Sequence, residues 1–302
     1  MIATTSHRNV PSVELEGLDI LWFQVSGTLC NLTCHHCFIS CSPTNKTYGY
    51  LSLEDVEKQL QLSVEQGVRE YYFTGGEPFL NRDLVPMLER TLEYGPVTVL
   101  TNGTVLKEAW LERLRLAAKA SKFSLEFRVS IDGPTAEIND PIRGAGTFDR
   151  AMEGIRKLSA FGFLPIVTMT QTWEDSQSEE LLNQFRKTLM QVGNDRPRLK
   201  ILPRLKIGAE AERTSGYETY EKITPAMMEG YDASQLLCSH SRVVTDRGVA
   251  VCPILIDSPD AILGDTLNEA SRPFELTHGA CYTCYQYGAI CTNPSSKLSQ
   301  DS

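Results

Sequence analysis

The sequence predicts an α/β protein in which a parallel sheet precedes a small C-terminal appendage. Six short β-rich runs alternate with amphipathic segments across residues 20–202, a rhythm typical of parallel strands joined by right-handed helical crossovers. From about Tyr217 this rhythm stops, and five of the nine cysteines of the chain lie in the part that follows. A (β/α) barrel, full or partial, closes such a sheet, and an open doubly wound sheet is the alternative. Periodicity does not separate the two.

The expected strands are runs rich in β-branched and aromatic residues, at 20–25, 69–74, 97–101, 125–130, 165–170 and 199–202. The first expected helix begins at Ser52, where Ser-Leu-Glu-Asp forms a capping signal, and places Val56, Leu60 and Val64 on one face. Further helices are expected at 82–94, 107–120, 148–161 and 179–192, three of which stop at a glycine.

The appendage is predicted to begin with a β-hairpin. Residues 242–251 read as two short strands around an Asp-Arg-Gly turn, flanked by Cys238 and Cys252. A short helical piece near 273–278 leads into Cys281-Tyr-Thr-Cys284. We therefore divide the chain into 1–216, the barrel, and 217–302, an appendage. A unit of roughly 70–80 residues makes a weak core without a staple, so we expect a metal staple in the appendage.

Composition sets limits on the partners of this chain of 302 residues. Apolar residues make up 41% and charged residues 22%, which excludes wholesale disorder. No run approaches the roughly 18 apolar residues of a membrane span, and the N-terminus lacks a secretory apolar region. A net charge of −9 argues against nucleic acid or an anionic membrane as partner. We expect a soluble, cytoplasmic protein.

Nine cysteines are unevenly distributed, with one group at 30–41 and a second at 238–291. A reducing cytosol disfavours disulfides, so clustered thiols there more often bind metal or perform redox chemistry. Cys30, Cys34 and Cys37 form a C-x3-C-x2-C array just after the first strand. Three thiols on one loop suit an iron–sulfur cluster with one iron open. Zinc is the alternative, with His35 or His36 completing its ligands.

A second motif, Thr74-Gly75-Gly76-Glu77-Pro78, ends the second strand. Paired glycines let a backbone approach a ligand closely, and a carboxylate suits a cationic amine. With the cysteine array this motif resembles the signature of the radical S-adenosylmethionine (SAM) enzymes. The resemblance implies a partial (β/α)6 barrel in which the cysteine triplet holds a [4Fe–4S] cluster that binds SAM. Glu77 would pair with the amino group of SAM, and Phe38 would pack beside its adenine.

Four residues at later strand ends match positions of the same family. The resemblance implies that Ser130 binds the ribose or carboxylate of SAM and that Arg143 is a candidate partner for its carboxylate, with Asn102 and Asp132 on the same rim. Taken singly, Asn102-Gly and Asp132-Gly-Pro are ordinary turns, and a loop arginine is usually solvated.

The second cysteine group supplies a four-thiol set, Cys238, Cys252, Cys281 and Cys284, for which zinc and iron–sulfur are both open from spacing alone. This set resembles the "twitch" appendage of radical SAM enzymes, a short form of the SPASM domain, and so implies an auxiliary [4Fe–4S] cluster. Cys291 is left over and is able to replace one ligand.

The family resemblance implies a reaction. An electron from a donor such as flavodoxin or ferredoxin cleaves SAM to methionine and a 5′-deoxyadenosyl radical, which abstracts hydrogen from a substrate. We expect an oxidoreductase acting on a small sugar- or cyclitol-like molecule, with the auxiliary cluster accepting the electron. The alternatives are an epimerase in which Cys41 or Cys291 donates hydrogen, a peptide-modifying maturase, and a metal-binding structural protein. Candidate substrate contacts follow the last two strands: Gln171, Trp173, Arg204, Lys206, Arg213 and Tyr217.

Overall fold

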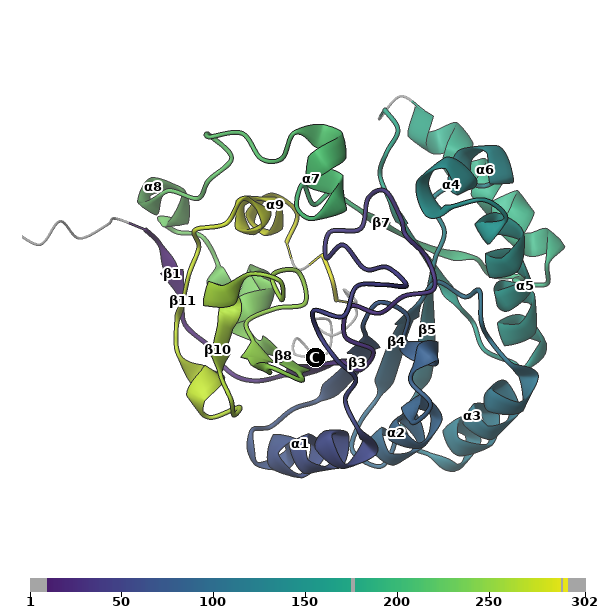
Figure 1. Cartoon of the computed structure of the whole chain (residues 1–302), viewed down its shortest axis with the longest axis horizontal. Coiled ribbons are helices and arrows are strands. Elements are labelled where there is room, and N and C mark those ends of the chain that lie inside the picture. Colours follow the sequence, from purple (N-terminus) through teal and green to yellow (C-terminus); the bar gives the residue numbers. More distant parts are fainter. Residues whose placement is uncertain (1–9, 175–176, 289, 293–302) are drawn as a thin grey trace, which may run out of the picture.

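A nine-stranded sheet, curved into a partial barrel, organises the chain (Figure 1). The computed structural model describes residues 10–174, 177–288 and 290–292. The strands are β2 (Ile20–Gln24), β3 (Glu70–Thr74), β4 (Val97–Thr101), β5 (Leu125–Ser130), β6 (Ile166–Thr170), β7 (Arg198–Leu202), β8 (Ser241–Thr245), β9 (Gly248–Ala250) and β10 (Ile262–Gly264). They run in the order β10-β9-β8-β2-β3-β4-β5-β6-β7, and the seven from β8 to β7 are parallel. The predicted partial barrel is confirmed.

Helices cover the outer face of this sheet, along the lower and right-hand sides of Figure 1. They are α1 (Leu53–Glu65), α2 (Leu84–Thr91), α3 (Glu108–Ala120), α5 (Thr147–Ala160) and α6 (Ser178–Gln191). Shorter elements fill the connections: α4 (Ala136–Arg143), α7 (Ala209–Thr214), α8 (Pro225–Met228), α9 (Gly279–Tyr287) and the 3₁₀ turns η1 (Pro78–Leu80), η3 (Ala233–Gln235), η4 (Leu237–Ser239), η5 (Pro259–Ala261) and η6 (Glu269–Ser271). A small separate sheet pairs β1 (Ser12–Val13) with β11 (Phe274–Glu275).

Strand alternation divides the apolar residues between two clusters. Leu21 and Phe23 of β2 face the helices in the larger cluster, whereas Ile20 and Trp22 face the interior of the barrel with Tyr72 of β3. The Trp22 and Tyr72 rings stack with their centroids 4.3 Å apart. This follows from the two-residue period of a strand. The inner faces of the strands therefore line the barrel lumen.

The six predicted strands lie within one residue of their expected ends. Ser52 caps α1 as expected, since its hydroxyl accepts the Asp55 N–H and the Asp55 carboxylate accepts the Ser52 N–H. The placement of Val64 was wrong, because this side chain is 63% exposed. Steps of four residues drift by about 40° around a helix, so the third member of such a series leaves the buried face. Ser63 is buried instead.

Three features of the chain after the first strands differ from expectation or were not expected. The helical piece near 273–278 is wrong, because this segment contains β11, and the helix that follows it is α9. Helix α4, with Pro141 inside it, was not predicted. The hairpin expected in the appendage is present as β8 and β9, but β8 also pairs in parallel with β2, so that it extends the barrel sheet.

Among the described residues, no helix combines the length and the apolar character that crossing a membrane requires.

Candidate active site

The cysteine triplet lies on the long connection between β2 and α1. Two backbone hydrogen bonds join this connection to the turn after β3, from Gly76 N to the Gly27 carbonyl (2.9 Å) and from Glu77 N to the Leu29 carbonyl (3.1 Å). The carboxyl ends of parallel strands meet at one edge of a sheet. The two sequence motifs are therefore in direct contact there.

The glycine pair permits this contact. A Cβ atom on Gly76 would lie 2.2 Å from the Leu29 carbonyl oxygen, and one on Gly75 would lie 2.1 Å from Ser26 Oγ. Both distances are shorter than any tolerated contact between heavy atoms. The sequence reasoning assigned the glycines to close approach of a ligand, whereas the structure shows that they first let the turn approach the cysteine loop.

The Glu77 carboxylate is fully buried and accepts three hydrogen bonds. The donors are the Asn102 N–H (2.7 Å), the Thr101 hydroxyl (2.7 Å) and the Phe79 N–H (3.1 Å). Burial raises the pKa of this carboxyl to about 7, although the three donors act in the opposite direction. Glu77 therefore joins the ends of β3 and β4, and its contact with the SAM amino group stays a prediction.

Hydrogen-bond donors approach two of the three thiols. The Leu32 N–H points at Cys30 Sγ (3.4 Å), and the Cys41 N–H points at Cys37 Sγ (3.3 Å). The Asn102 amide lies 3.7 Å from Cys30 Sγ. Such donors stabilise a thiolate, which is the form that ligates iron. Burial raises the pKa of Cys30 to about 12 in the absence of a bound group.

Cys41 lies beneath the loop, in the inner apolar cluster. Its thiol donates a hydrogen bond to Cys37, and this is the largest cause that lowers the pKa of Cys37 to about 6. The side chain is buried against a predicted iron ligand. A role of Cys41 as a hydrogen donor stays a prediction.

A buried cluster of charged side chains, formed by His36, Asp132 and Arg143, lies just beyond the carboxyl end of β5, at the rim of the barrel. Asp132 Oδ2 lies 2.7 Å from His36 Nε2 and 2.5 Å from Arg143 Nε, and Asp132 Oδ1 accepts the Thr170 N–H (2.7 Å). Burial alone raises the pKa of Asp132, but the charges of Arg143 and His36 outweigh it and hold this pKa well below its usual range. Arg143 also lies beside Cys34. The rim therefore ties the cysteine loop to α4.

His36 was considered only as a zinc ligand from the sequence, and its contact with Asp132 was missed. Across the part of the chain that the structure describes, no three His, Cys, Asp or Glu side chains converge as a single metal ion requires. No sequence pattern predicts this pairing, because 96 residues separate His36 from Asp132 along the chain. An acidic residue at the end of a strand was the only available signal.

The other rim residues that the sequence singled out lie close by. Asn102 is buried and donates to Asn31 Oδ1 (2.9 Å) on the cysteine loop. Ser130 is half-buried at the end of β5, and Thr74 ends β3. Phe38 is partly buried and contacts both apolar clusters. Their assignments toward SAM stay predictions.

Several buried polar atoms around this rim have no hydrogen-bond partner among the described residues, including Gln24 Oε1, Ser26 Oγ and His36 Nδ1. A buried polar atom is normally paired. Three thiols on one loop, N–H donors to two of them and unpaired polar atoms nearby fit an iron–sulfur cluster that carries a polar organic ligand.

The second cysteine group lines a single apolar cavity. Cys238, Cys252, Cys281 and Cys284 border it together with apolar side chains: Leu236, Leu237, Val251, Ile254, Leu255, Phe274, Leu276 and Ala280. Burial raises the pKa of all four thiols. Cys281 and Cys284 lie on α9 (Gly279–Tyr287) and not on a loop. The four thiols thus border one cavity, and their role as cluster ligands stays a prediction.

Two further residues bear on this cavity. Arg242 is fully buried, and its guanidinium donates to the carbonyls of Ala270 (2.7 Å) and Cys238 (2.7 Å). It was not recognised from the sequence, because an arginine within a strand pattern usually faces solvent. Cys291 is near enough to raise the pKa of Cys284, and burial raises its own pKa to about 12.

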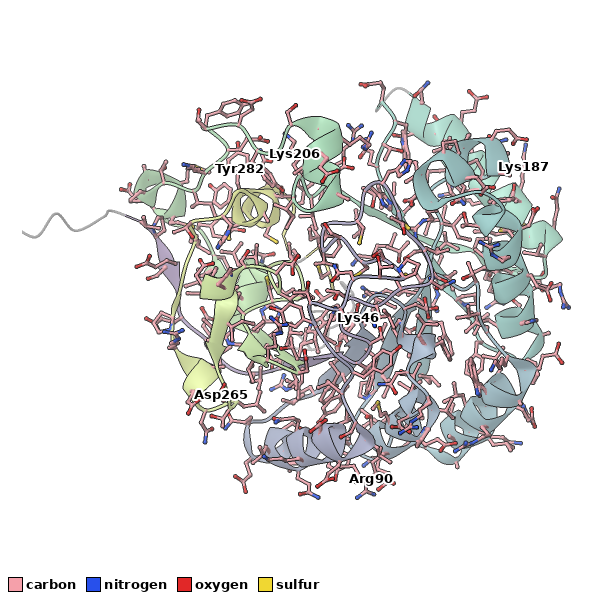
Figure 2. The ribbon with its side chains drawn as sticks, viewed as in Figure 1. Lys46, Arg90, Lys187, Lys206, Asp265 and Tyr282 are labelled. Carbon is pink, nitrogen blue, oxygen red and sulfur yellow. The ribbon has the colours of Figure 1, made fainter. Side chains whose placement is uncertain are left out.

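The predicted substrate contacts are largely occupied by protein partners. Lys206, labelled in Figure 2, lies 2.8 Å from the Glu221 carboxylate, and Arg213 lies 2.6 Å from Glu210. The remaining four have uncharged partners: Arg204 donates to the Gln171 carbonyl, Trp173 to Ser178 Oγ, and Tyr217 pairs with the Thr283 hydroxyl. Their roles as substrate contacts stay predictions.

Curated relatives match part of the chain. The Bacillus subtilis protein named antilisterial bacteriocin subtilosin biosynthesis protein AlbA is 32% identical over 143 residues, which are 47% of this chain and 31% of AlbA. The GTP 3′,8-cyclase of Petrotoga mobilis is 28% identical over 182 residues, 59% of this chain and 54% of that enzyme. The aligned region thus spans about a third to a half of these relatives.

Among solved structures, SuiB of Streptococcus suis bound to the precursor peptide SuiA superposes with a TM-score of 0.63 at 14% identity, covering 84% of this chain and 65% of SuiB. This likeness shows the fold. The model of the radical SAM superfamily matches residues 25–178, from the end of β2 to the start of α6. That match contains the cysteine triplet, the Gly-Gly-Glu turn and the Asp132 rim, and it spans just over half of the 302 residues, so the chain belongs to the radical SAM superfamily.

Proposed function

We propose that this radical SAM enzyme is an oxidoreductase that removes hydrogen from a small sugar- or cyclitol-like molecule and passes the remaining electron to an auxiliary [4Fe–4S] cluster. The apolar cavity bordered by four cysteines supports this most directly. The hairpin between Cys238 and Cys252 is hydrogen-bonded to the barrel through β8 and β2. An electron acceptor in that cavity would thus be attached to the sheet that surrounds the substrate.

In this proposal, different residues at the barrel rim have different roles. Cys30, Cys34 and Cys37 would hold the [4Fe–4S] cluster that the family implies, and Leu32 and Cys41 N–H groups stabilise two of the thiolates. Bound cluster and SAM supply the reductive cleavage that generates the hydrogen-abstracting species. Asp132 and Glu77, both fully buried, fix the loops that contact them.

Further residues bind and orient SAM in this proposal. Ser130 contacts its ribose or carboxylate, Asn102 lies on the same rim, and Phe38 packs beside the adenine. Arg143 pairs with the carboxylate of SAM while Asp132, 2.5 Å away, holds the guanidinium in place. An ion pair of this kind fixes orientation, which bidentate groups such as arginine do well.

The appendage forms a second functional unit in this proposal, with the division near residue 216. Cys238, Cys252, Cys281 and Cys284 hold the auxiliary cluster, and the surrounding apolar side chains keep water away from it. Two thiols, Cys41 and Cys291, are then left without an iron. A flavodoxin- or ferredoxin-like protein would supply the first electron.

Peptide maturation is the second candidate. AlbA is named for the biosynthesis of a bacteriocin, and SuiB was solved with a precursor peptide. The name of the GTP 3′,8-cyclase, by contrast, specifies a small molecule.

Iron content and substrate conversion test the proposal together. Anaerobically reconstituted protein should hold about eight irons per chain, as two four-iron clusters require. The double variant Cys238→Ala/Cys252→Ala should hold about half of them and still cleave SAM with a chemical reductant, but it should not oxidise substrate. Cys291→Ala, the matched control, should keep all of the iron.

The substrate class is tested with amino sugars and cyclitols against linear peptides, each followed by mass spectrometry for the loss of two hydrogens. A colourless, zinc-loaded and folded protein would contradict the iron–sulfur assignment. Conversion of peptides alone would establish the second candidate.

A further inference from the structure

Arg242 carries a positive charge into the buried part of the sheet. It is the second residue of β8, whose five residues are all buried, and β9 and β2 pair with this strand on its two sides. Its neighbour Val243 faces the inner apolar cluster, so strand alternation turns Arg242 to the opposite face. The larger apolar cluster, which includes Cys252, Cys281 and Cys284, lies on that face. The guanidinium is therefore on the same side of the sheet as the cavity that the cysteines border.

The hydrogen bonds of this guanidinium go to backbone carbonyls. Nε donates to the Ala270 carbonyl (2.7 Å) and Nη2 to the Arg272 carbonyl (3.3 Å). Nη1 donates to the carbonyls of Cys238 and Ser241, both at 2.7 Å. Among the described residues, no carboxylate forms an ion pair with Arg242. These uncharged partners fix the position of the guanidinium without neutralising it.

The opposite charges that act on Arg242 come from the predicted auxiliary ligands. Ionised Cys238 and Cys252 act to raise its pKa, against burial, which lowers it to about 10. The guanidinium therefore stays charged at neutral pH. A buried charge is costly unless an opposite charge accompanies it. The position of Arg242 thus favours an anionic group in the cavity beside it.

A cluster held by four thiolates is such a group. The thiolates outweigh the positive charge of a four-iron core, so the whole is anionic, and reduction adds further negative charge. In a medium of low dielectric, a fixed positive charge interacts more favourably with the reduced form than with the oxidised form. A buried arginine at this place would therefore raise the reduction potential.

We propose that Arg242 is the fixed counter-charge of the auxiliary cluster and raises its reduction potential, which enables the cluster to accept the substrate's electron. The inference rests on the proposed function. In that reaction the substrate gives a hydrogen atom to the 5′-deoxyadenosyl radical, a proton to water and an electron to the auxiliary cluster, so it loses two hydrogens in all. Arg242 acts through the cluster and is a positioning residue.

Reduction potentials of anaerobically reconstituted variants test this role. In the background Cys30→Ala/Cys34→Ala/Cys37→Ala only the auxiliary cluster should be present, so a redox titration followed by electron paramagnetic resonance reports on it alone. Arg242→Gln should lower the ratio of reduced to oxidised cluster at a given potential about tenfold or more, a negative shift of about 59 mV or more for one electron. Arg242→Lys keeps the charge and should stay close to the background. Arg247→Gln, at the exposed turn of the same hairpin, is the control and should cause no shift.

The holoenzyme provides a second measurement. With both clusters bound, Arg242→Gln should move only one of the two reduction steps. Arg242→Met, of similar length, is a further neutral variant in case Arg242→Gln does not fold. If neither neutral variant folds with its auxiliary iron but Arg242→Lys does, the charge is needed to hold the cluster, which supports the inference. If none of the three does, the residue has a structural role and the inference is overturned.

Equal potentials with and without the charge at residue 242 would also overturn the inference, as would an equal shift in Arg242→Lys and Arg242→Gln. Iron content and substrate oxidation, measured on the same samples, separate the two proposals. A wild type that holds two clusters and oxidises its substrate, with a potential that Arg242→Gln leaves unchanged, would refute only the role of Arg242. A wild type without clusters would refute the proposed function.

Discussion

The buried carboxyl of Glu77 makes stability depend on pH in an unusual direction. Its pKa rises from 4.5 to about 7 in the folded protein because burial disfavours the charged form. The folded state therefore binds a proton more tightly than the unfolded state. This contribution to stability is complete below the unfolded pKa and is lost as pH rises through the folded pKa.

The magnitude follows from the shift. At about 1.4 kcal/mol per pKa unit, the contribution of Glu77 to the free energy of unfolding falls by about 2–3 kcal/mol between about pH 5 and pH 8. Glu77→Gln removes this titration. It also places an amide NH₂ against one of the two N–H donors, from Asn102 or Phe79, at a cost of about 1–3 kcal/mol that does not vary with pH.

Urea unfolding of both proteins at several pH values, under anaerobic conditions and followed by far-ultraviolet circular dichroism, measures the difference between them. Other titrating groups cancel in that difference. We expect the advantage of the wild type over Glu77→Gln to shrink by about 2–3 kcal/mol from pH 5 to pH 8. A difference that stays constant across this range would refute the reasoning. SAM affinity of the same variant tests the predicted contact with the SAM amino group, whose loss would weaken binding by roughly 1.5–3 kcal/mol.

Three more experiments test the site. Gly76→Ala forces a Cβ to 2.2 Å from a backbone oxygen, so we expect this variant to lose about 1–3 kcal/mol of stability and part of its iron. The control is Gly17→Ala, whose Cβ would have no atom within 4 Å, and it should match the wild type in urea unfolding. Asp132→Asn leaves its buried cationic partner without a counter-charge and should cost about 3–5 kcal/mol; equal unfolding midpoints would contradict this. In deuterated solvent, a dehydrogenase should give an oxidised product without solvent-derived deuterium on carbon, and Cys41→Ala and Cys291→Ala should stay active; a labelled product with loss of turnover in either variant would show an epimerase instead.

The sequence predicted the strands well because each is a short, continuous run with a clear turn signal after it. Residues 97–101 and 125–130 were located at their observed bounds. The errors have local causes. Residues 273–278 lack a helical repeat, and their pairing with β1 depends on a partner more than 200 residues away. Helix α4 was not predicted, and it contains Pro141, a residue type that usually ends a helix.

The site was predictable where spacing along the chain determined it. The cysteine triplet and the Gly-Gly-Glu turn each lie within a few residues, so a motif records them. The pairing of His36 with Asp132 and the burial of Arg242 depend on how distant strands come together. No local pattern encodes such contacts, and only the folded chain displays them.

The pairing of β8 with β2 has a consequence for how the protein is made. Trp22 is in register with Val243, so the middle of the sheet is completed only after most of the chain has left the ribosome. Long-range parallel pairing closes slowly, since the entropy of a large loop is lost before any contact offsets it. Until then β2 presents an unpaired, apolar edge that other nascent chains are able to join. The cysteine loop begins where β2 ends, so iron loaded onto the native loop enters a molecule whose C-terminal part is already in place.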